Sequence, residues 1–174
     1  MLTKTTVLVI SAALTLAGCS SSSNEAAPSA PATAGGSATL TGTPVSVEVS
    51  GEAGTEPKVV ITPGDPVTEL QVTDVIVGEG DAVQAGATVT AHYVGYGAAS
   101  GQMFDSSWVR GEPATFPLPN VILGWQEGLV AMQAGGRRLL VIPAELGYGD
   151  NPPQGSGIEP GETLIFVVDL VSSE

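Results

Sequence analysis

The side chains that could do chemistry in this chain are mainly aromatic, and they are concentrated in its second half. The 174 residues include one Cys and one His, which leaves no internal disulfide, no Cys-ligated metal cluster and no His-rich metal site. No nucleophile and base pair, Gly-rich phosphate loop, Gly-x-Ser-x-Gly or His-Glu-x-x-His motif is evident, which disfavours a hydrolase. We therefore expect no cofactor and no metal. All the aromatic residues follow residue 92; they are Tyr93, Tyr96, Phe104, Trp108, Phe116, Trp125, Tyr148 and Phe166.

Four segments of the C-terminal part have the pattern of β-strands, and they would position these aromatic residues. Apolar and polar residues alternate over 70–77 and over 88–96, and β-rich runs follow at 137–142 and 163–170. Turn-forming residues bound each segment. The pattern predicts four or more strands, mostly antiparallel.

One segment has the spacing of a helix. Asn120 is a suitable N-cap, and Gly135–Gly136 would end the helix. Apolar residues between them stand at i, i+3, i+7 and i+10; these are Ile122, Trp125, Leu129 and Met132. One short helix among these strands predicts an α+β domain in which the helix covers one face of a sheet.

Five sequence strings, in the same order and spacing over about 108 residues, resemble the FKBP-type peptidyl-prolyl isomerases. Any one of them would be a weak signal, whereas five in register are specific. The strings are Val89–Gly95, Phe104–Ser107, Val121–Leu129, Ile142–Gly149 and Thr163–Leu170. The resemblance implies a twisted antiparallel sheet wrapped around one short helix, with the active pocket between them.

The resemblance also implies which residues form that pocket. Trp125 would be the floor under a prolyl ring, and the backbone N–H of Ile122 and the hydroxyl of Tyr148 would bind substrate carbonyls. Arg110 stands where the family often has an Arg that pairs with the pocket Asp. Carried onto matching positions, the pocket would consist of Tyr93, Phe104, Asp105, Val121, Ile122, Trp125, Tyr148 and Phe166.

The chemistry of prolyl isomerisation suits such a pocket. Rotation about an X-Pro bond costs about 20 kcal/mol because amide resonance must be broken. No covalent bond is made or cut, so neither a nucleophile nor a metal is required. The twisted amide has lost part of its charge separation, so an apolar pocket favours it relative to the planar form. An FKBP-like module that binds partners or nascent chains without turnover is the alternative, although the aromatic pocket is retained and no chaperone insertion is present.

Several polar residues near these strings have a structural interpretation as well. Asp105 begins an Asp-Ser-Ser sequence that is also typical of a turn or a cap. His92 would point to the strand face opposite Tyr93, so we expect a structural histidine. The Arg137–Arg138 pair is interpreted as a solvated strand end.

The sequence departs from the family pattern at two places. Ala114 stands at a pocket-rim position that is often Phe in the family, so one wall would be lower. The loop Asp150–Gly161 is rich in Pro and Gly, and Gly157 precedes Ile158 where a second aliphatic residue is common. These departures from the family pattern would affect substrate preference and macrolide affinity most.

The N-terminal residues have the pattern of an export signal. Lys4 precedes the mainly apolar run Val7–Leu16, which is too short to span a bilayer as a mature helix. The segment Leu16–Cys19 resembles the lipobox of bacterial lipoproteins, in which the Cys is lipidated and becomes the mature N-terminus. We therefore predict a signal peptide over 1–18 and lipidation of Cys19; an ordinary signal peptide with an incidental Cys is the alternative.

The segment after Cys19 predicts a flexible tether over 19–44, because Ser, Ala, Gly, Thr and Pro cannot offset chain entropy by burial. A random coil of this length spans roughly 25–30 Å. Residues 45–66 form an extension with two short apolar patterns, compatible with one or two edge strands or with a stiffer part of the tether. The isomerase domain is predicted over 67–174.

The charge of the chain limits its partners. It carries 18 acidic and five basic side chains, a net charge of −13, which becomes −14 when Lys4 leaves with the signal. So few cations argue against binding to nucleic acid or to anionic lipid head groups. The expected partners are proline-containing, unfolded or newly exported polypeptides and macrolide ligands. We expect a monomer at the extracytoplasmic face of the cell membrane, in the periplasm or the cell-wall zone, held by its lipid alone.

Overall fold

The part of the chain that can be described runs from residue 43 to residue 174 in this computed structural model. The predicted signal peptide over 1–18, Cys19 and most of the predicted tether lie outside the described residues. Within residues 43–174, no helix has the length and apolar character needed to cross a lipid bilayer.

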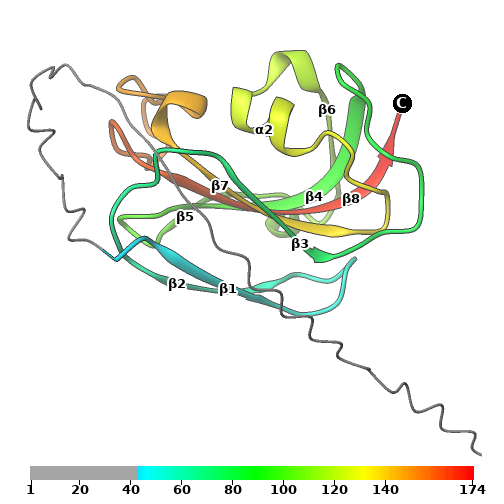
Figure 1. Cartoon of the computed structure of the whole chain (residues 1–174), viewed down its shortest axis with the longest axis horizontal. Helices are drawn as coiled ribbons and strands as arrows, with labels where there is room; N and C mark the ends of the chain where they lie inside the picture. Colours follow the sequence, from blue (N-terminus) through cyan, green and yellow to red (C-terminus); the bar gives the residue numbers. More distant parts are fainter. Residues whose placement is uncertain (1–42) are drawn as a thin grey trace, which may run out of the picture. The chain divides into compact units, whose positions relative to one another are not determined.

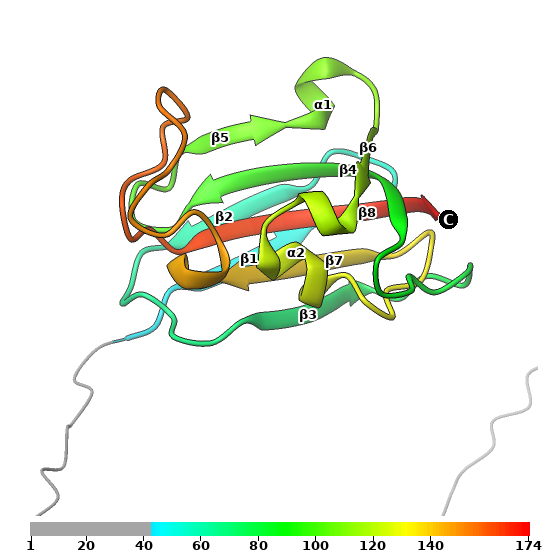
Figure 2. The ribbon, with the colours of Figure 1, turned by 90° about the horizontal axis from the view of Figure 1, so that it is seen from above.

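A six-stranded antiparallel sheet forms the centre of the domain (Figures 1 and 2). Its main path is, in spatial order, β3 (Gln71–Ile76), β7 (Arg137–Ile142), β8 (Leu164–Ser173), β4 (Thr88–Gly97) and β5 (Met103–Ser106). A further strand, β6 (Ala114–Pro117), pairs with the first half of β4. The four predicted strands are all present. The two that sequence reasoning missed, β5 and β6, have only four residues each, too few to show a period.

The central strand β8 is buried because other strands flank both of its edges and hydrophobic clusters cover both of its faces. It pairs with β7 along one edge and with β4 along the other, and residues 164–170 are all buried. Alternate residues then serve two different cores: Leu164 and Phe166 face one hydrophobic cluster, whereas Ile165 faces another. Burial on both faces explains why this strand has a continuous apolar run.

One face of the sheet is covered by the short helix α2 (Leu123–Gly128), which packs on β7 (Figure 2). Two glycines allow the close approach. A Cβ atom on Gly124 would lie 2.4 Å from Ile142 Cγ2, and one on Gly128 would lie 2.7 Å from a methyl carbon of Leu140. The helix therefore rests almost directly on the strand, and Trp125 between the two glycines is buried in the main core.

The predicted helix boundaries are wrong at both ends. Asn120 is the last residue of a 3-10 turn, η1 (Leu118–Asn120), and the N-cap of α2 is Ile122. The helix also ends before Gly135–Gly136, because the chain leaves it to pair with a distant loop. Ala131 has a positive φ of 62° and donates to Val83 O, while Met132 O accepts from Val83 N. Tertiary pairing thus overrides an apolar spacing that suggested a longer helix.

The opposite face of the sheet carries a hairpin formed by β1 (Ser46–Ser50) and β2 (Lys58–Thr62) (Figure 1). These strands pair with each other as a separate two-stranded sheet and do not extend an edge of the main sheet. They pack over a second hydrophobic cluster formed by Val45, Val67, Ala98, Val141 and Ile165. Of the alternatives that the sequence left for 45–66, the structure shows two strands packed on the domain.

The interpretation of Arg137–Arg138 as a solvated strand end is wrong. Arg137 is fully buried and pairs with Asp169, with its Nε 2.6 Å from Oδ1 and its Nη2 2.7 Å from Oδ2. Arg138 is 7% exposed, and it pairs with Asp74 and also donates to Gly128 O. Each charge is tolerated inside because a carboxylate pairs with it and backbone oxygens accept from it, although Arg137 Nη1 has no partner among the described residues.

Candidate active site

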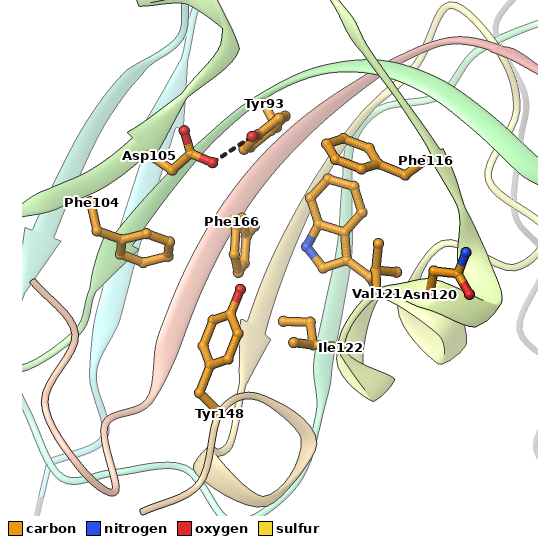
Figure 3. Close-up of a pocket in the computed structure, with 10 residues that line it drawn as sticks. Tyr93, Phe104, Asp105, Phe116, Asn120, Val121, Ile122, Tyr148 and Phe166 are labelled. Atoms are coloured by element: carbon orange, nitrogen blue, oxygen red, sulfur yellow. Dashed lines mark hydrogen bonds between the residues drawn. The ribbon is translucent and has the colours of Figure 1, made fainter. Parts of the chain in front are cut away.

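A pocket of about 300 Å³ opens between the sheet and the segment around α2 (Figure 3). All eight residues that sequence reasoning assigned to the site lie around it. The complete lining is Tyr93, Phe104, Asp105, Phe116, Asn120, Val121, Ile122, Trp125, Tyr148 and Phe166.

Trp125 is a buried lining residue of the pocket, and three aromatic rings lie edge-on to it. Its ring centroid lies 5.4 Å from that of Tyr93, 5.5 Å from that of Phe116 and 5.4 Å from that of Phe166, at interplanar angles of 88°, 78° and 86°. Edge-to-face pairs of this kind stabilise one another beyond the burial of their area. The rings therefore hold a fixed apolar wall.

A bulge in β5 brings two adjacent residues into the same pocket. Asp105 pairs with Gly95, and Met103 pairs with Tyr96, so Phe104 between them has no partner across the ladder. In a regular strand, neighbouring side chains point to opposite faces, but an extra residue in one strand changes that alternation. Phe104 can thus pack on Phe166, at 5.5 Å between ring centroids, while Asp105 also lines the pocket.

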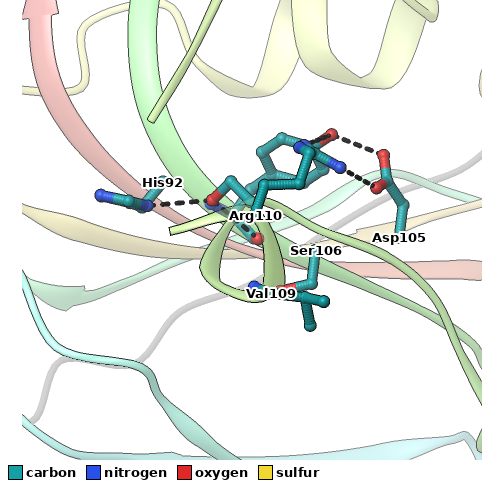
Figure 4. Close-up of polar contacts among 7 residues, drawn as sticks. His92, Asp105, Ser106, Val109 and Arg110 are labelled. Carbon is teal, nitrogen blue, oxygen red and sulfur yellow. Dashed lines mark hydrogen bonds and ion pairs between the residues drawn. The ribbon is translucent and has the colours of Figure 1, made fainter. Parts of the chain in front are cut away.

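The polar side of the pocket is a closed triangle of three side chains (Figures 3 and 4). The Tyr93 hydroxyl donates to Asp105 Oδ2 at 2.5 Å, and Arg110 donates from Nη1 to Asp105 Oδ1 at 2.6 Å and from Nη2 to the Tyr93 hydroxyl at 2.7 Å. Burial, and then the hydrogen bond to Asp105, raise the pKa of Tyr93 to about 12. Burial acts to raise the pKa of Asp105, but the hydrogen bonds from Tyr93 and Arg110 outweigh it and lower that pKa. Near neutral pH, Asp105 is charged and Tyr93 is neutral.

Several polar groups of the pocket have no hydrogen-bond partner in the described part of the chain, among them the buried indole Nε1 of Trp125. Within residues 43–174, neither the hydroxyl of Tyr148 nor the backbone N–H of Ile122 has a hydrogen-bond partner. Burial and the nearby charge of Asp105 raise the pKa of Tyr148, so its phenol keeps its proton near neutral pH. Both groups can therefore donate to carbonyl oxygens.

Sequence reasoning missed two lining residues, Phe116 and Asn120. Phe116 stands two positions after Ala114, on the same face of β6, and supplies an aromatic wall there, whereas Ala114 packs against the core and is not among the lining residues. The signal for Phe116 was its place among only eight aromatic residues. Asn120 directly precedes Val121, but it was interpreted as a helix cap.

His92 lies outside the pocket, as expected for a structural histidine (Figure 4). Its ring stacks on Trp108 with centroids 4.0 Å apart, and its Nδ1 lies 3.0 Å from Ser107 Oγ. The same hydroxyl accepts from the backbone N–H of Tyr93 at 2.8 Å. In the Asp-Ser-Ser sequence, the residue with the capping role is Ser106, which is the N-cap of the one-turn helix α1 (Ser107–Arg110).

The loop over 150–161 follows a second 3-10 turn, η2 (Ala144–Leu146), and carries the second departure from the family pattern. Gly157 has a φ of 78°, in the left-handed region that favours glycine. Ile158 packs against the main core and does not line the pocket. The buried carboxylate of Glu162 fixes the end of this loop by accepting from Glu159 N at 2.9 Å.

Comparisons with known proteins identify the class that this fold and pocket define. Residues 80–171 match the family described as "FKBP-type peptidyl-prolyl cis-trans isomerase". The chain is 49% identical to an "FK506-binding protein" of Streptomyces anulatus over 67% of its length and 96% of the relative's. It is 45% identical to a "Probable FK506-binding protein" of Corynebacterium glutamicum, over 68% and 98%. The chain belongs to the FKBP-type peptidyl-prolyl cis-trans isomerases.

Solved structures agree with this assignment. The crystal structure of FkpA from Escherichia coli matches 62% of this chain and 49% of its own, with a TM-score of 0.56 and 42% identity. That of AtFKBP13 matches 63% of this chain and 96% of its own, with a TM-score of 0.55 and 36% identity. The predicted fold and the predicted enzyme class are confirmed. The activity of the chain is the acceleration of cis–trans exchange about X-Pro bonds.

Proposed function

We propose that this isomerase acts on proline-containing segments of unfolded or newly exported proteins, from an anchor on the extracytoplasmic face of the cell membrane. The observation that carries the anchor is the single Cys of the chain, which stands at the end of Leu16–Cys19 directly after an apolar export signal. A lipidated Cys of this kind carries two acyl chains, enough for stable anchoring where one chain gives marginal binding. The acidic charge cannot contribute, so the lipid supplies the attachment.

The pocket supports a specific arrangement of the substrate. The prolyl ring lies on Trp125 between Tyr93, Phe104 and Phe166, and the free donors of Ile122 and Tyr148 bind carbonyl oxygens beside the proline. The edge-on aromatic rings around Trp125 carry this proposal, because they form an apolar site that favours the twisted amide over the planar one. The charges of Asp105 and Arg110 are already paired with each other.

The same pocket is also the proposed site for FK506-type macrolides. Two relatives that share 45–49% of their residues with this chain are named for binding FK506. Ala114, which leaves the wall of β6 to Phe116, is the feature that would alter macrolide affinity. Titration followed by tryptophan fluorescence would measure that affinity, and Phe166→Ala should weaken it.

The catalytic role of the pocket is tested by exchange in a short Xaa-Pro-Phe peptide. Wild type should accelerate cis–trans exchange, and Asp105→Val and Phe166→Ala should each reduce kcat/KM at least tenfold. A wild-type rate equal to that of the uncatalysed peptide would contradict catalysis, whereas full activity in both variants would place the reaction elsewhere.

The anchor is tested separately, in cells that express the full chain. The wild-type protein should sediment with membranes and resist extraction by salt, and Cys19→Ser should appear in the soluble extracytoplasmic fraction. Ser20→Ala, one residue away, is the matched control and should stay with membranes. A Cys19→Ser protein that still partitions with membranes would contradict lipidation without affecting the catalytic proposal.

A further inference from the structure

The peptide unit that joins Val121 to Ile122 lies at the edge of the pocket, and its surroundings are almost fully hydrogen-bonded. Val121 N donates to Leu118 O at 3.2 Å, and Val121 O accepts from Gln126 Nε2 at 2.8 Å. Ile122 O accepts from the backbone N–H groups of Trp125 and Gln126, at 3.0 Å and 3.2 Å. Of the backbone N–H and C=O groups of Val121 and Ile122, three have hydrogen-bond partners. The N–H of Ile122 has none among residues 43–174.

Gln126 binds two consecutive peptide units, this one through its side chain and the next one through its backbone. Its side chain binds the carbonyl before the N–H of Ile122, and its backbone binds the carbonyl after it. A trans peptide unit is planar, and its C=O and N–H point in opposite directions. Fixing the oxygen of Val121 therefore also fixes the direction of the Ile122 N–H, which points away from Gln126.

The bond from Gln126 to Val121 does not serve to cap the helix. The first turn of a helix leaves N–H groups unpaired, whereas its first carbonyls already accept bonds from within the helix. The N-terminus of α2 has no side-chain cap, and the Gln126 amide donates to a carbonyl that precedes the helix. What this bond restrains is the orientation of one peptide plane.

We propose that Gln126 is a positioning residue for isomerisation: its side-chain amide orients the Ile122 N–H toward the substrate carbonyl. The inference rests on the role of the Ile122 N–H proposed above. Both Val121 and Ile122 line the pocket, so a rotation of their shared peptide plane would misalign the donor without changing the aromatic walls. A donor held in place before the substrate binds needs no reorganisation during the reaction.

Three variants of the full chain test this inference in the Xaa-Pro-Phe exchange assay. Gln126→Met removes the donor at similar size and should lower kcat/KM roughly three- to tenfold, as expected for one lost or misaligned hydrogen bond. Gln126→Lys restores a donor and should remain within about twofold of wild type. Gln84→Met is the matched control, because Gln84 Nε2 also donates to a backbone carbonyl, Ala82 O at 3.1 Å, away from the pocket.

The amide proton of Ile122 gives a readout that a purely structural role would not move. In wild type and in Gln84→Met, saturating peptide should shift this NMR resonance downfield; in Gln126→Met the shift should be less than half as large, while the indole resonance of Trp125 responds as in wild type. Equal shifts, wild-type kcat/KM in Gln126→Met, or a Lys variant as slow as the Met variant would each overturn the inference. An inactive wild type would instead contradict the proposed role of the pocket.

Discussion

At the scale of single residues, the polar groups of the pocket are arranged so that each keeps one protonation state. Asp105 is held in its charged form by Tyr93 and Arg110, and Tyr93 is held in its neutral form by burial and by Asp105. Neither group exchanges a proton near neutral pH, so general acid–base catalysis is not their role. The triangle instead fixes two walls of the pocket, and the isomerisation depends on shape and on burial of the amide.

The raised pKa of Tyr93 predicts a loss of stability at high pH. The pKa is about 12 in the folded protein and about 10 in the unfolded chain, so the neutral form is favoured by folding. This contribution is complete below pH 10 and declines as pH rises from about 10 toward about 12. Urea unfolding at pH 9 and pH 11 should show a smaller decline for Tyr93→Phe than for wild type. An equal decline in both proteins would contradict the assignment.

Phe116 should matter to catalysis although it lies outside the sequence strings that resemble the family. Phe116→Ala removes an edge-on partner of both Tyr93 and Trp125, and we expect kcat/KM to fall at least fivefold. The unfolding midpoint should fall as well, because truncation of a packed Phe costs about 3–5 kcal/mol. Thr115→Ala, an exposed neighbour on the same strand, should leave kcat/KM unchanged. Unaltered kcat/KM in Phe116→Ala would exclude a role for this wall.

At the scale of elements, the position of Trp125 depends on how α2 is held against β7. The two glycines bring the helix close, and Arg138 on β7 donates to Gly128 O at 2.8 Å and to Val130 O at 3.1 Å at the C-terminal end of the helix. A cation is favourable at this end, where carbonyls are unpaired. The strand therefore sets the place of Trp125 through packing at one end and hydrogen bonds at the other.

Gly124→Ala should test the close approach. The added methyl group would overlap Ile142, so the helix must shift, and overpacking of this kind costs about 1–3 kcal/mol. We expect a lower unfolding midpoint together with reduced kcat/KM, because Trp125 moves with the helix. Glu127→Ala, on the exposed side of α2, is the control and should change neither. A Gly124→Ala protein as stable as wild type would contradict the close contact.

Arg138 can be separated from its ion pair by comparing two variants. Asp74→Asn removes the carboxylate at a partly exposed position and should cost about 1 kcal/mol or less. Arg138→Met also leaves Gly128 O and Val130 O without their donor and should cost about 3 kcal/mol or more. Urea unfolding measures both. Equal losses would mean that the carbonyl contacts contribute nothing to stability.

At the scale of the whole molecule, the hairpin of β1 and β2 belongs to the folded domain. It covers Val141 and Ile165, and its tip contacts the buried ion pair: Gly54 N donates to Asp169 Oδ2 at 2.7 Å, and Arg137 Nη2 donates to Thr55 O at 2.5 Å. The helix and the hairpin thus enclose the two faces of one sheet. The ion pair between Arg137 and Asp169 comes from two strands of the main sheet. The tip of the hairpin, which precedes residue 67, completes its burial.

Removal of the hairpin should destabilise the domain. A chain that begins at Val67 exposes Val141 and Ile165, each worth about 1.5–3 kcal/mol when buried, and leaves the charges of Arg137 and Asp169 partly unpaired. We expect its thermal midpoint to fall by at least 5 °C relative to a chain that begins at residue 43. Equal midpoints for the two chains would show that the hairpin adds nothing to the stability of the domain.

Residue types and their spacing were enough to predict the family, the fold class, four of the six strands of the main sheet and eight of the ten residues that line the pocket. These features follow from local composition and from strings whose residue types and spacing resemble the family: alternation predicts strands such as 88–96, and the aromatic residues stand within or beside the strings. The anchor at Cys19 also rests on sequence alone, and it stays a prediction.

Features that depend on partners far apart in the chain could not be predicted and became visible in the folded domain. The helix stops at Gly128 because the chain beyond it pairs with Val83, and the Arg137–Arg138 pair is buried because Asp169, Asp74 and the hairpin tip surround it. Phe104 and Asp105 share the pocket because β5 bulges against β4. The periodicity of a sequence indicates which residues of a segment face water and which face the core, but not which other segment packs against it. Long-range contacts determine where helices end, where strands bulge and which charges are buried.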